Sequence, residues 1–404
     1  MKRREFLKTS MVASAAVLGS ATALNAAEIP SGAHQAKDTY KVDPIPFPEK
    51  MPLIVHSDRP PLLESPMSVF TRGITQNEQF YVRWHLPDIP THIDLAKFRL
   101  KIDGLVDHEL SFSVDELKND FEQVEVTAVQ QCGGNSRSSF YPITGGIQWG
   151  SGAMGCARFK GVRLSDLLNR AGLKKGAKWL EFNGLEKAAY YKTPNFVREL
   201  NVDELDDHVI VAYEMNGEDF PYLNGFPIRL VIPGYYSDSW VKMLSHITVS
   251  NKYKHLFFMD KGYRIADNAT ESEKPGHLAP ITKPITHMDV KSVIGYPEEG
   301  MKIYHNSEVV VRGVAFDDGH GIEKVLVSVD GGKTWEKSLL KQENGRYAYT
   351  EFRYGFKPTK HGKVTIMAKA VNYLGQEQPL DKDIGWNRGG YKYNGIDKVT
   401  VEVI

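Results

Sequence analysis

The sequence predicts an α+β fold in two domains, a mixed α/β domain over residues 67–275 followed by an immunoglobulin-like β-sandwich over residues 285–404. A chain of 404 residues is too long for one ordinary core. Helical and strand patterns occur together in the first region, whereas only strand patterns follow residue 290. Residues 271–286, rich in Pro, Thr, Lys and Gly, are typical of a linker between the two domains.

The first domain carries apolar patterns with recognisable ends. Alternating or β-branched runs favour strands, and apolar residues at helical spacing after a capping residue favour helices. These patterns predict strands at 98–104, 124–129 and 226–233, and helices starting at Ser113 and spanning 162–171.

The second domain consists of short alternating runs separated by turn residues, a pattern that favours an antiparallel sandwich. The expected strands are 308–316, 324–330, 347–356, 363–371 and 398–404. Asp330, Gly331 and Gly332 form a hairpin signal after the second of them.

Residues 1–27 have the features of an export signal. A basic start containing Arg3 and Arg4 is followed by an uncharged run that ends in small residues. The paired arginines resemble the twin-arginine signal, which exports folded proteins and predicts a periplasmic location; an ordinary secretory signal is the alternative. Residues 28–66 are Pro-rich, which forbids long helices and predicts an extended strap across a domain surface.

The composition excludes several classes of function. Lys plus Arg and Asp plus Glu total 50 each, so no net field favours nucleic acid. After the signal, no run of about 18 apolar residues occurs, so we expect no membrane span in the mature protein. The two cysteines, Cys132 and Cys156, exclude a disulfide scaffold, although one disulfide between them remains an alternative.

Cys132 is the residue with the strongest chemical signal. It follows the β-branched run and precedes Gly133 and Gly134, a backbone that bends sharply and allows a ligand to approach closely. A thiolate suits a soft or high-valent metal, and Arg137 nearby favours the thiolate form. Taken alone, a small buried cysteine beside a glycine turn explains the pattern equally well.

Several ordered motifs resemble the sulfite oxidase family of molybdopterin enzymes. The segment 257–265 is most similar to the family's bacterial sulfite dehydrogenases, which pair with a cytochrome c. Gln131 to Arg137 (QCGGNSR) is similar to the family's molybdenum-ligand motif. The resemblance spans most of residues 40–404. The other similar segments are 80–87 (FYVRWHLP), 150–162, 213–217, 225–229, 233–234, 241–242, 257–265 and 386–387.

The resemblance implies one molybdenum–molybdopterin cofactor per chain, with the Cys132 thiolate as the protein ligand of the metal. It implies that sulfite is oxidised at this metal and that Arg83 and Arg137 bind the oxyanion. Tyr263 would form a hydrogen bond to a metal-bound or substrate oxygen, with a purely packed aromatic residue as the alternative. His85 would contact the cofactor or an incoming haem, or it is a packed histidine.

The remaining cofactor contacts implied by the resemblance are Asn135, Arg229 and Lys242. Arg229 and Lys242 lie on expected strands, where an unpaired charge is costly, so an anionic partner such as the pterin phosphate is expected. Two positions depart from the family pattern. The loop at 317–322 lacks an arginine that reaches the substrate in animal members and offers only His320. Cys156 stands where Asn or Ser is more usual, and we expect it to be structural.

The electron acceptor is expected to be a separate protein. No Cys-x-x-Cys-His haem motif and no dinucleotide fingerprint occurs, so we expect no haem in this chain and a c-type cytochrome as partner. A homodimer through the C-terminal domain is a further expectation. The alternatives are a sulfane dehydrogenase subunit of a thiosulfate-oxidising complex, a reductase of protein methionine sulfoxide, or a non-enzymatic binding protein.

Overall fold

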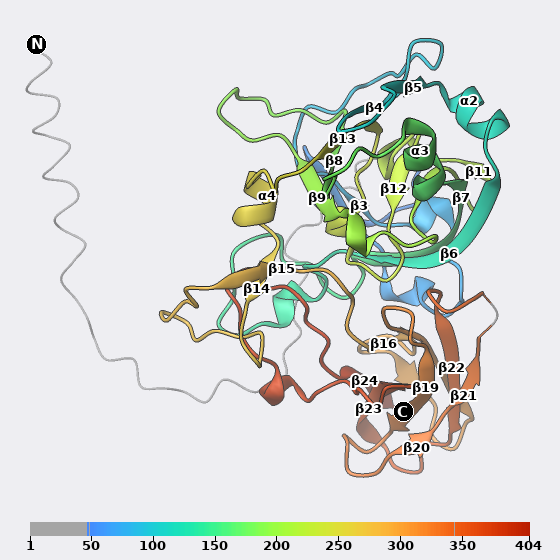
Figure 1. Ribbon diagram of the computed structural model, residues 1–404. Coiled ribbons are helices and arrows are strands. Elements are labelled where there is room, and N and C mark those ends of the chain that lie inside the picture. The colour runs from blue at the N-terminus through green and yellow to red at the C-terminus, as the bar shows by residue number, and fades with distance from the viewer. Residues whose placement is uncertain (1–46, 48, 343) are drawn as a thin grey trace, which may run out of the picture. The chain divides into compact units, whose positions relative to one another are not determined.

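The computed structural model describes residue 47, residues 49–342 and residues 344–404 (Figure 1). The predicted export signal lies outside the described residues, as does most of the Pro-rich segment. The described end of that segment is not a surface strap. It forms β1 (Ile54–Asp58) and β2 (Pro61–Glu64), which pair with β3 (Val82–Arg83) in the order β1-β2-β3. All four residues of β2 are buried, so this segment belongs to the interior of the fold.

Regular structure in the described residues is mostly β-strand, with short α-helices α2 (Val114–Asn119), α3 (Leu164–Ala171) and α4 (Phe257–Asp260). Ser113 caps α2 as predicted: its hydroxyl accepts from the Glu116 backbone N–H at 3.1 Å, and the Glu116 carboxylate accepts from the Ser113 N–H at 2.7 Å. None of the helices in these residues is long and apolar enough to span a membrane.

Two five-stranded sheets make up most of the first region. The first sheet has the order β11-β10-β7-β6, with β12 also paired to β10. The second has the order β5-β4-β13-β8-β9, in which only the β4–β13 pair is parallel. The strands of the first are β6 (Gln123–Gln131), β7 (Met154–Arg163), β10 (Ile210–Met215), β11 (Glu218–Asp219) and β12 (Arg229–Val231). Those of the second are β4 (Leu100–Gly104), β5 (Leu110–Phe112), β8 (Trp179–Gly184), β9 (Val197–Asn201) and β13 (Leu244–Ser250).

The predicted elements of this region occur with adjusted ends. The helix predicted over 162–171 begins at Leu164, because residues 162 and 163 complete β7, and it stops before Gly172, whose φ is +71°. The strand predicted over 226–233 is only β12. Pro227 and Pro233 lack the N–H that a ladder needs, which limits pairing to the residues between them.

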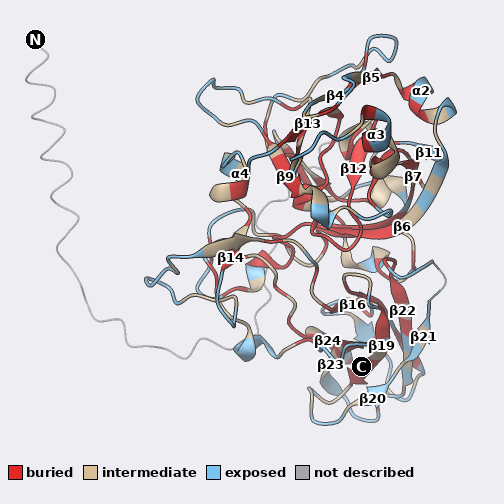
Figure 2. Cartoon of the chain, in the orientation of Figure 1, coloured by how far each residue is buried: buried red, intermediate tan, exposed pale blue. Residues whose placement is uncertain are grey.

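β6 changes from exposed to buried along its length, as Figure 2 shows. Its last four residues are buried, and the strand pairs with β7 so that Gln131 lies opposite Met154. The expected β-branched run therefore delivers Cys132 into the interior of the protein.

The C-terminal region consists of strands in two sheets that share one hydrophobic core. The four-stranded sheet has the order β16-β18-β22-β21, and the five-stranded sheet the order β17-β24-β23-β19-β20. Each of the predicted strands of this region is present. The bounds are β16 (Lys291–Tyr296), β17 (Lys302–Ile303), β18 (Val309–Phe316), β19 (Ile322–Ser328), β20 (Glu336–Lys337), β21 (Leu339–Lys341), β22 (Thr350–Phe356), β23 (Gly362–Asn372) and β24 (Asp397–Val403).

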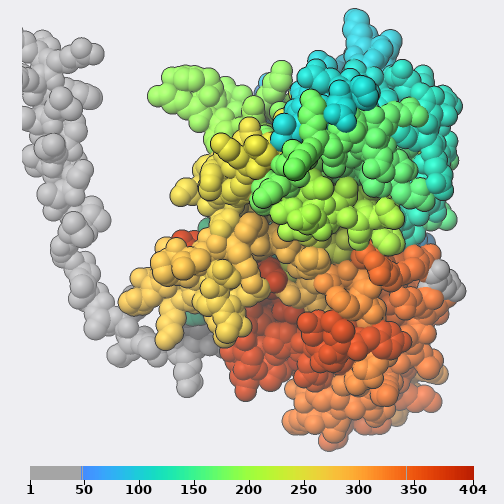
Figure 3. Space-filling model, in the orientation of Figure 1, coloured from blue at the N-terminus to red at the C-terminus, as the bar shows by residue number. Residues whose placement is uncertain are grey.

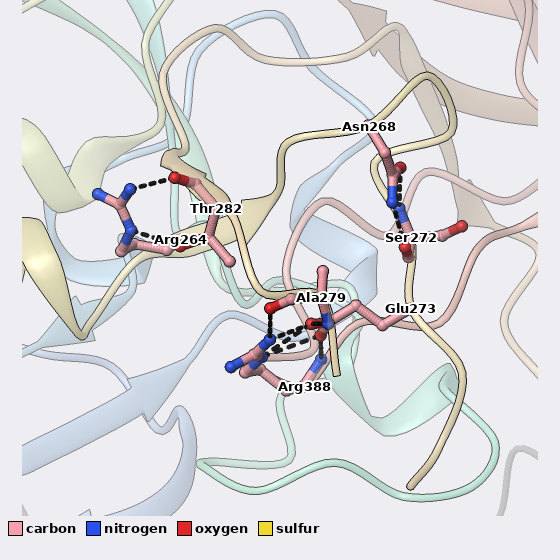
Figure 4. Close-up of polar contacts among 7 residues, drawn as sticks. All are labelled: Arg264, Asn268, Ser272, Glu273, Ala279, Thr282 and Arg388. Atoms are coloured by element: carbon pink, nitrogen blue, oxygen red, sulfur yellow. Dashed lines mark hydrogen bonds and ion pairs between the residues drawn. The ribbon is translucent and has the colours of Figure 1, made fainter. Parts of the chain in front are cut away.

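The predicted linker is anchored rather than free. β15 (Thr282–Pro284), inside the predicted linker, pairs with β14 (Arg264–Ala266), which precedes the linker, and the loop between these strands projects from the surface (Figure 3). Figure 4 shows how Arg388 holds this loop: its guanidinium bonds the Glu273 carboxylate and donates to the Ala279 carbonyl at 2.7 Å. The C-terminal region is thereby tied to the segment that precedes it.

Candidate functional site

A cavity lies beyond the buried end of β6. Polar and charged side chains make up most of its wall. The lining residues are Tyr81, Arg83, His85, Gln130, Cys132, Leu223, Asn224, Arg229, Ser237, Asp238, Lys242 and Tyr263. The structure therefore brings together six of the sequence-predicted site residues: Arg83, His85, Cys132, Arg229, Lys242 and Tyr263.

Cys132 is a free thiol that is 5% exposed and is held by backbone hydrogen bonds. Its N–H donates to the Ala153 carbonyl at 3.0 Å, and its carbonyl accepts from the Asn135 N–H at 2.9 Å. Cys156 is also free, so the alternative of a disulfide is wrong. The site thus keeps a thiol fixed by backbone on the cavity wall.

Gly133 and Gly134 make room for the chain itself. A Cβ at Gly133 would lie 2.4 Å from the Ile285 Cδ1, and one at Gly134 would lie 2.4 Å from a guanidinium nitrogen of Arg137. The structure thus gives these two glycines a packing role, and close approach by a ligand remains the expectation from the sequence. Close packing of Ile285 and Arg137 behind the cysteine explains them.

Two basic side chains of this cavity, Arg83 and Arg229, have a nitrogen atom without a hydrogen-bond acceptor among the described residues. Arg229 donates to the Asn224 and Trp240 carbonyls, but its Nε finds no partner among the described residues, nor does Nη1 of Arg83. Burial lowers the pKa of Lys242 to about 7 and that of Arg229 to about 10. Since a buried charge without a partner is costly, this wall fits an anionic ligand.

His85 and Tyr263 form a tight pair on the same wall. The His85 Nε2 lies 2.5 Å from the Tyr263 hydroxyl, and Phe196 stacks on the imidazole with ring centroids 3.4 Å apart. Burial, together with the charges of Arg83 and Lys242, holds the pKa of His85 well below its ordinary value. Burial also raises the pKa of Tyr263 well above its usual range, so the imidazole is neutral and the phenol protonated near neutral pH.

Asp238 is a carboxyl that the sequence analysis missed. Its Oδ2 lies 3.2 Å from a guanidinium nitrogen of Arg198, and its Oδ1 finds no partner among the described residues. Burial raises its pKa to about 7, against the opposing effect of Arg198. Tyr81 was missed as well; its hydroxyl lies 2.6 Å from the Ser237 Oγ and accepts from Gln130 at 3.1 Å.

Two sequence-predicted site residues lie behind the wall rather than on it. Arg137 donates to the Gly389 and Ile147 carbonyls, both at 2.9 Å, and packs over the Tyr391 ring at 5.1 Å. Asn135 donates to the Ser151 carbonyl at 3.0 Å and accepts from Lys291 at 2.7 Å.

The two departures from the family pattern also lie apart from the cavity lining. His320 is exposed and contacts Asp318 at 2.6 Å within its own loop. Cys156 is fully buried on β7, and burial raises the pKa of its thiol to about 12. In the described part of the chain, neither His320 nor Cys156 lines the cavity, so neither supplies a group to its wall.

The chain matches two family models that divide it. Residues 85–258 match the oxidoreductase molybdopterin binding domain, and residues 282–403 match the Mo-co oxidoreductase dimerisation domain. The chain is 32% identical to the mitochondrial sulfite oxidase of Mus musculus, over 94% of this chain and 70% of that protein. The chain belongs to the sulfite oxidase family. It is also 31% identical to the sulfite oxidase of Gallus gallus, over 89% of this chain and 79% of that protein.

A solved structure is similar to this chain over almost its whole length. The crystal structure of the sulfane dehydrogenase SoxCD from Paracoccus pantotrophus has a TM-score of 0.74 and is 25% identical, over 93% of this chain and 97% of that one. The cofactor class of the family fits this cavity, because a free thiol and under-partnered cationic groups face the same space.

The cavity residues that the sequence analysis missed differ in how clearly the sequence indicates them. Tyr81 lies within the 80–87 segment and could have been included with Arg83 and His85. Asp238 lies in a segment without periodicity, as does Glu186, whose carboxylate accepts from the His85 backbone N–H at 3.0 Å. Their relation to the cavity is set by tertiary contacts alone.

Proposed function

We propose that this protein oxidises sulfite to sulfate at a molybdenum–molybdopterin cofactor whose metal is bound by Cys132. The observation that supports the proposal most strongly is the free Cys132 thiol on a wall shared with Arg83, Arg229 and Lys242. Sulfite and water give sulfate, two protons and two electrons. When bound, the cofactor supplies the oxygen-atom and redox chemistry.

The chain's own residues bind and orient the anions. Nη1 of Arg83 has no partner among the described residues and can donate to an oxyanion. Burial opposes the charge of this guanidinium, but Tyr263, Cys132 and Glu186 raise its pKa. Lys242 and Arg229 would hold the anionic end of the cofactor, since both are buried and the Arg229 Nε has no partner among the described residues.

Electrons would leave one at a time to a separate c-type cytochrome in the periplasm. The export pattern of residues 1–27 supports that location, and the family's dimerisation domain supports a homodimer through residues 282–403. Redox contacts of this kind are often small and transient.

A second candidate is oxidation of sulfane sulfur as a subunit of a thiosulfate-oxidising complex. The similarity to the Paracoccus sulfane dehydrogenase over nearly the whole chain favours it. The two candidates share the cofactor and differ in the substrate.

The test uses the full-length protein purified from periplasmic extract. We expect molybdenum and pterin in a one-to-one ratio with the chain, and sulfite-dependent reduction of cytochrome c. Thiosulfate, which contains a sulfane sulfur, is assayed in parallel. Reduction with the sulfane substrate alone would replace the first proposal by the second, and absence of both molybdenum and pterin would overturn both.

A further inference from the structure

Glu186 is a buried carboxyl that lies beside the cavity and contacts His85. It is 3% exposed and lies just after β8. Its Oε2 accepts from the backbone N–H groups of His85 and Leu86 at 3.0 and 2.9 Å. This oxygen therefore fixes the backbone that carries the imidazole.

The other oxygen of Glu186 faces the imidazole itself. Its Oε1 lies 3.6 Å from the His85 Nδ1, and the two side chains are 2% and 4% exposed. Neither atom finds another hydrogen-bond partner among the described residues. If Nδ1 carried no proton, two buried acceptors would face each other without a donor, which costs free energy.

We infer that Glu186 keeps the ring proton of His85 on Nδ1, so that Nε2 accepts a hydrogen bond from the Tyr263 hydroxyl. The 2.5 Å contact between Nε2 and the hydroxyl then has a single direction. A neutral imidazole has only one N–H, and burial with Arg83 holds the pKa of His85 low enough to keep it neutral.

This arrangement determines whether the Tyr263 hydroxyl acts as a hydrogen-bond donor or acceptor toward the cavity. A phenol has one proton, and donating it to His85 leaves the oxygen as an acceptor toward the cavity. Donation to an oxyanion then falls to Arg83, whose Nη1 is unpartnered among the described residues. Glu186 acts through His85 and is a positioning residue; its kinetic effect rests on the proposed function, whereas the position of the proton does not.

The test uses Glu186→Gln, which keeps the size of the side chain. The amide oxygen can still accept from the His85 and Leu86 N–H groups, but the amide NH₂ then faces Nδ1 and turns it into an acceptor. The ring proton moves to Nε2, and the hydrogen bond to Tyr263 reverses. A merely structural role of Glu186 would not move this proton.

Nitrogen NMR of holoenzyme labelled at the histidine rings measures the proton directly. The His85 signals are identified by their loss in His85→Asn. We expect a protonated Nδ1 and an unprotonated Nε2 in the wild type, and the reverse in Glu186→Gln. A wild type protonated at Nε2, or an unchanged tautomer in the variant, overturns the inference. If the variant fails to fold, the wild-type spectrum still decides.

Kinetics provide a second readout if the proposed function holds. We expect Glu186→Gln to lower kcat/KM for sulfite about three- to tenfold, as the reorientation of one hydrogen bond does. In a Tyr263→Phe background the same change should have no further effect, because the hydroxyl that it reorients is gone. Additive effects would overturn the coupling, and a protein without sulfite turnover would leave the NMR result valid.

Discussion

At the scale of single residues, the site is defined by buried basic groups with nitrogen atoms that have no hydrogen-bond partner among the described residues. One wall carries a buried thiol, an arginine nitrogen without a partner in the described part of the chain, and a lysine whose pKa is lowered to about 7. The two basic groups are costly in a protein interior, and an anionic cofactor whose metal is bound by the thiol would satisfy them. The same reasoning separates Cys132 from Cys156, which is buried away from the cavity lining.

Replacing Cys132 by serine is expected to abolish sulfite oxidation and leave the fold intact. The hydroxyl is a harder and far less acidic ligand than the thiol, while the volume and backbone contacts are kept. Turnover, molybdenum content and Tm are measured together. Cys156→Ser is the matched control, which we expect to keep turnover. Near wild-type activity in the Cys132 variant would remove this residue as the metal ligand.

Arg137 is expected to affect stability more than substrate binding. The resemblance implies an oxyanion contact, but its hydrogen bonds go to the Ile147 and Gly389 carbonyls and its face to Tyr391. Losing a charged hydrogen bond costs about 1.5–3 kcal/mol, so Arg137→Gln should lower the free energy of unfolding by about that amount. Urea unfolding and the KM for sulfite are compared. A raised KM with unchanged stability would place Arg137 at the substrate after all.

At the scale of elements, the β6–β7 pair positions the cysteine. The connection between these strands packs tightly on β2, where the Glu64 carboxylate accepts from the Gly150 and Gly152 N–H groups at 3.0 and 2.9 Å. Glu64 also contacts His56 at 2.7 Å. The connection between β6 and β7, residues 132–153, is called the cysteine loop. The Pro-rich N-terminal segment therefore supports the cysteine loop through one buried carboxyl, that of Glu64.

Gly152→Ala tests this support. A Cβ there would lie 1.9 Å from the Ser65 carbonyl oxygen, so β2 or the loop must move. Overpacking of this kind costs about 1–3 kcal/mol, and we expect a lower Tm and reduced molybdenum content. The control is Gly145→Ala, where a Cβ meets nothing within 4 Å. Equal effects of the two changes would contradict the role of this contact.

At the scale of the whole molecule, the C-terminal region completes the cysteine loop. Lys291 of β16 donates to the Asn135 Oδ1, the Ser136 Oγ and the Tyr393 carbonyl at 2.7, 2.8 and 3.0 Å. The Lys392 N–H donates to the Gly133 carbonyl at 3.0 Å. The dimerisation domain thus holds the loop that follows Cys132 in place through these hydrogen bonds, in addition to any role in assembly.

Lys291 is expected to make stability depend on pH. Burial lowers its pKa to about 7, against an unfolded value of 10.5. Between these values the unfolded state binds more protons, so the contribution of Lys291 makes stability rise with pH across that window. We expect the difference in unfolding free energy between the wild type and Lys291→Met to change in favour of the wild type from pH 7 to 10. Parallel urea curves at each pH would contradict this.

The sequence by itself determined the elements and the chemistry of the central residue. The β-branched run into Cys132, the cap at Ser113 and the C-terminal strands are local patterns, and local patterns are encoded by neighbouring residues. The ordered motifs predicted that Arg83, His85, Arg229, Lys242 and Tyr263 serve one site, and the cavity brings all five together with the cysteine.

Only the tertiary structure decided which groups contact one another. Glu186, Asp238 and Lys291 are far from Cys132 in sequence, and no local pattern links them to it. The glycines after Cys132 admit Ile285 and Arg137, and Arg137 faces backbone carbonyls behind the wall. Such contacts depend on packing between distant segments, so the residue types are readable in sequence while their partners are set by the fold.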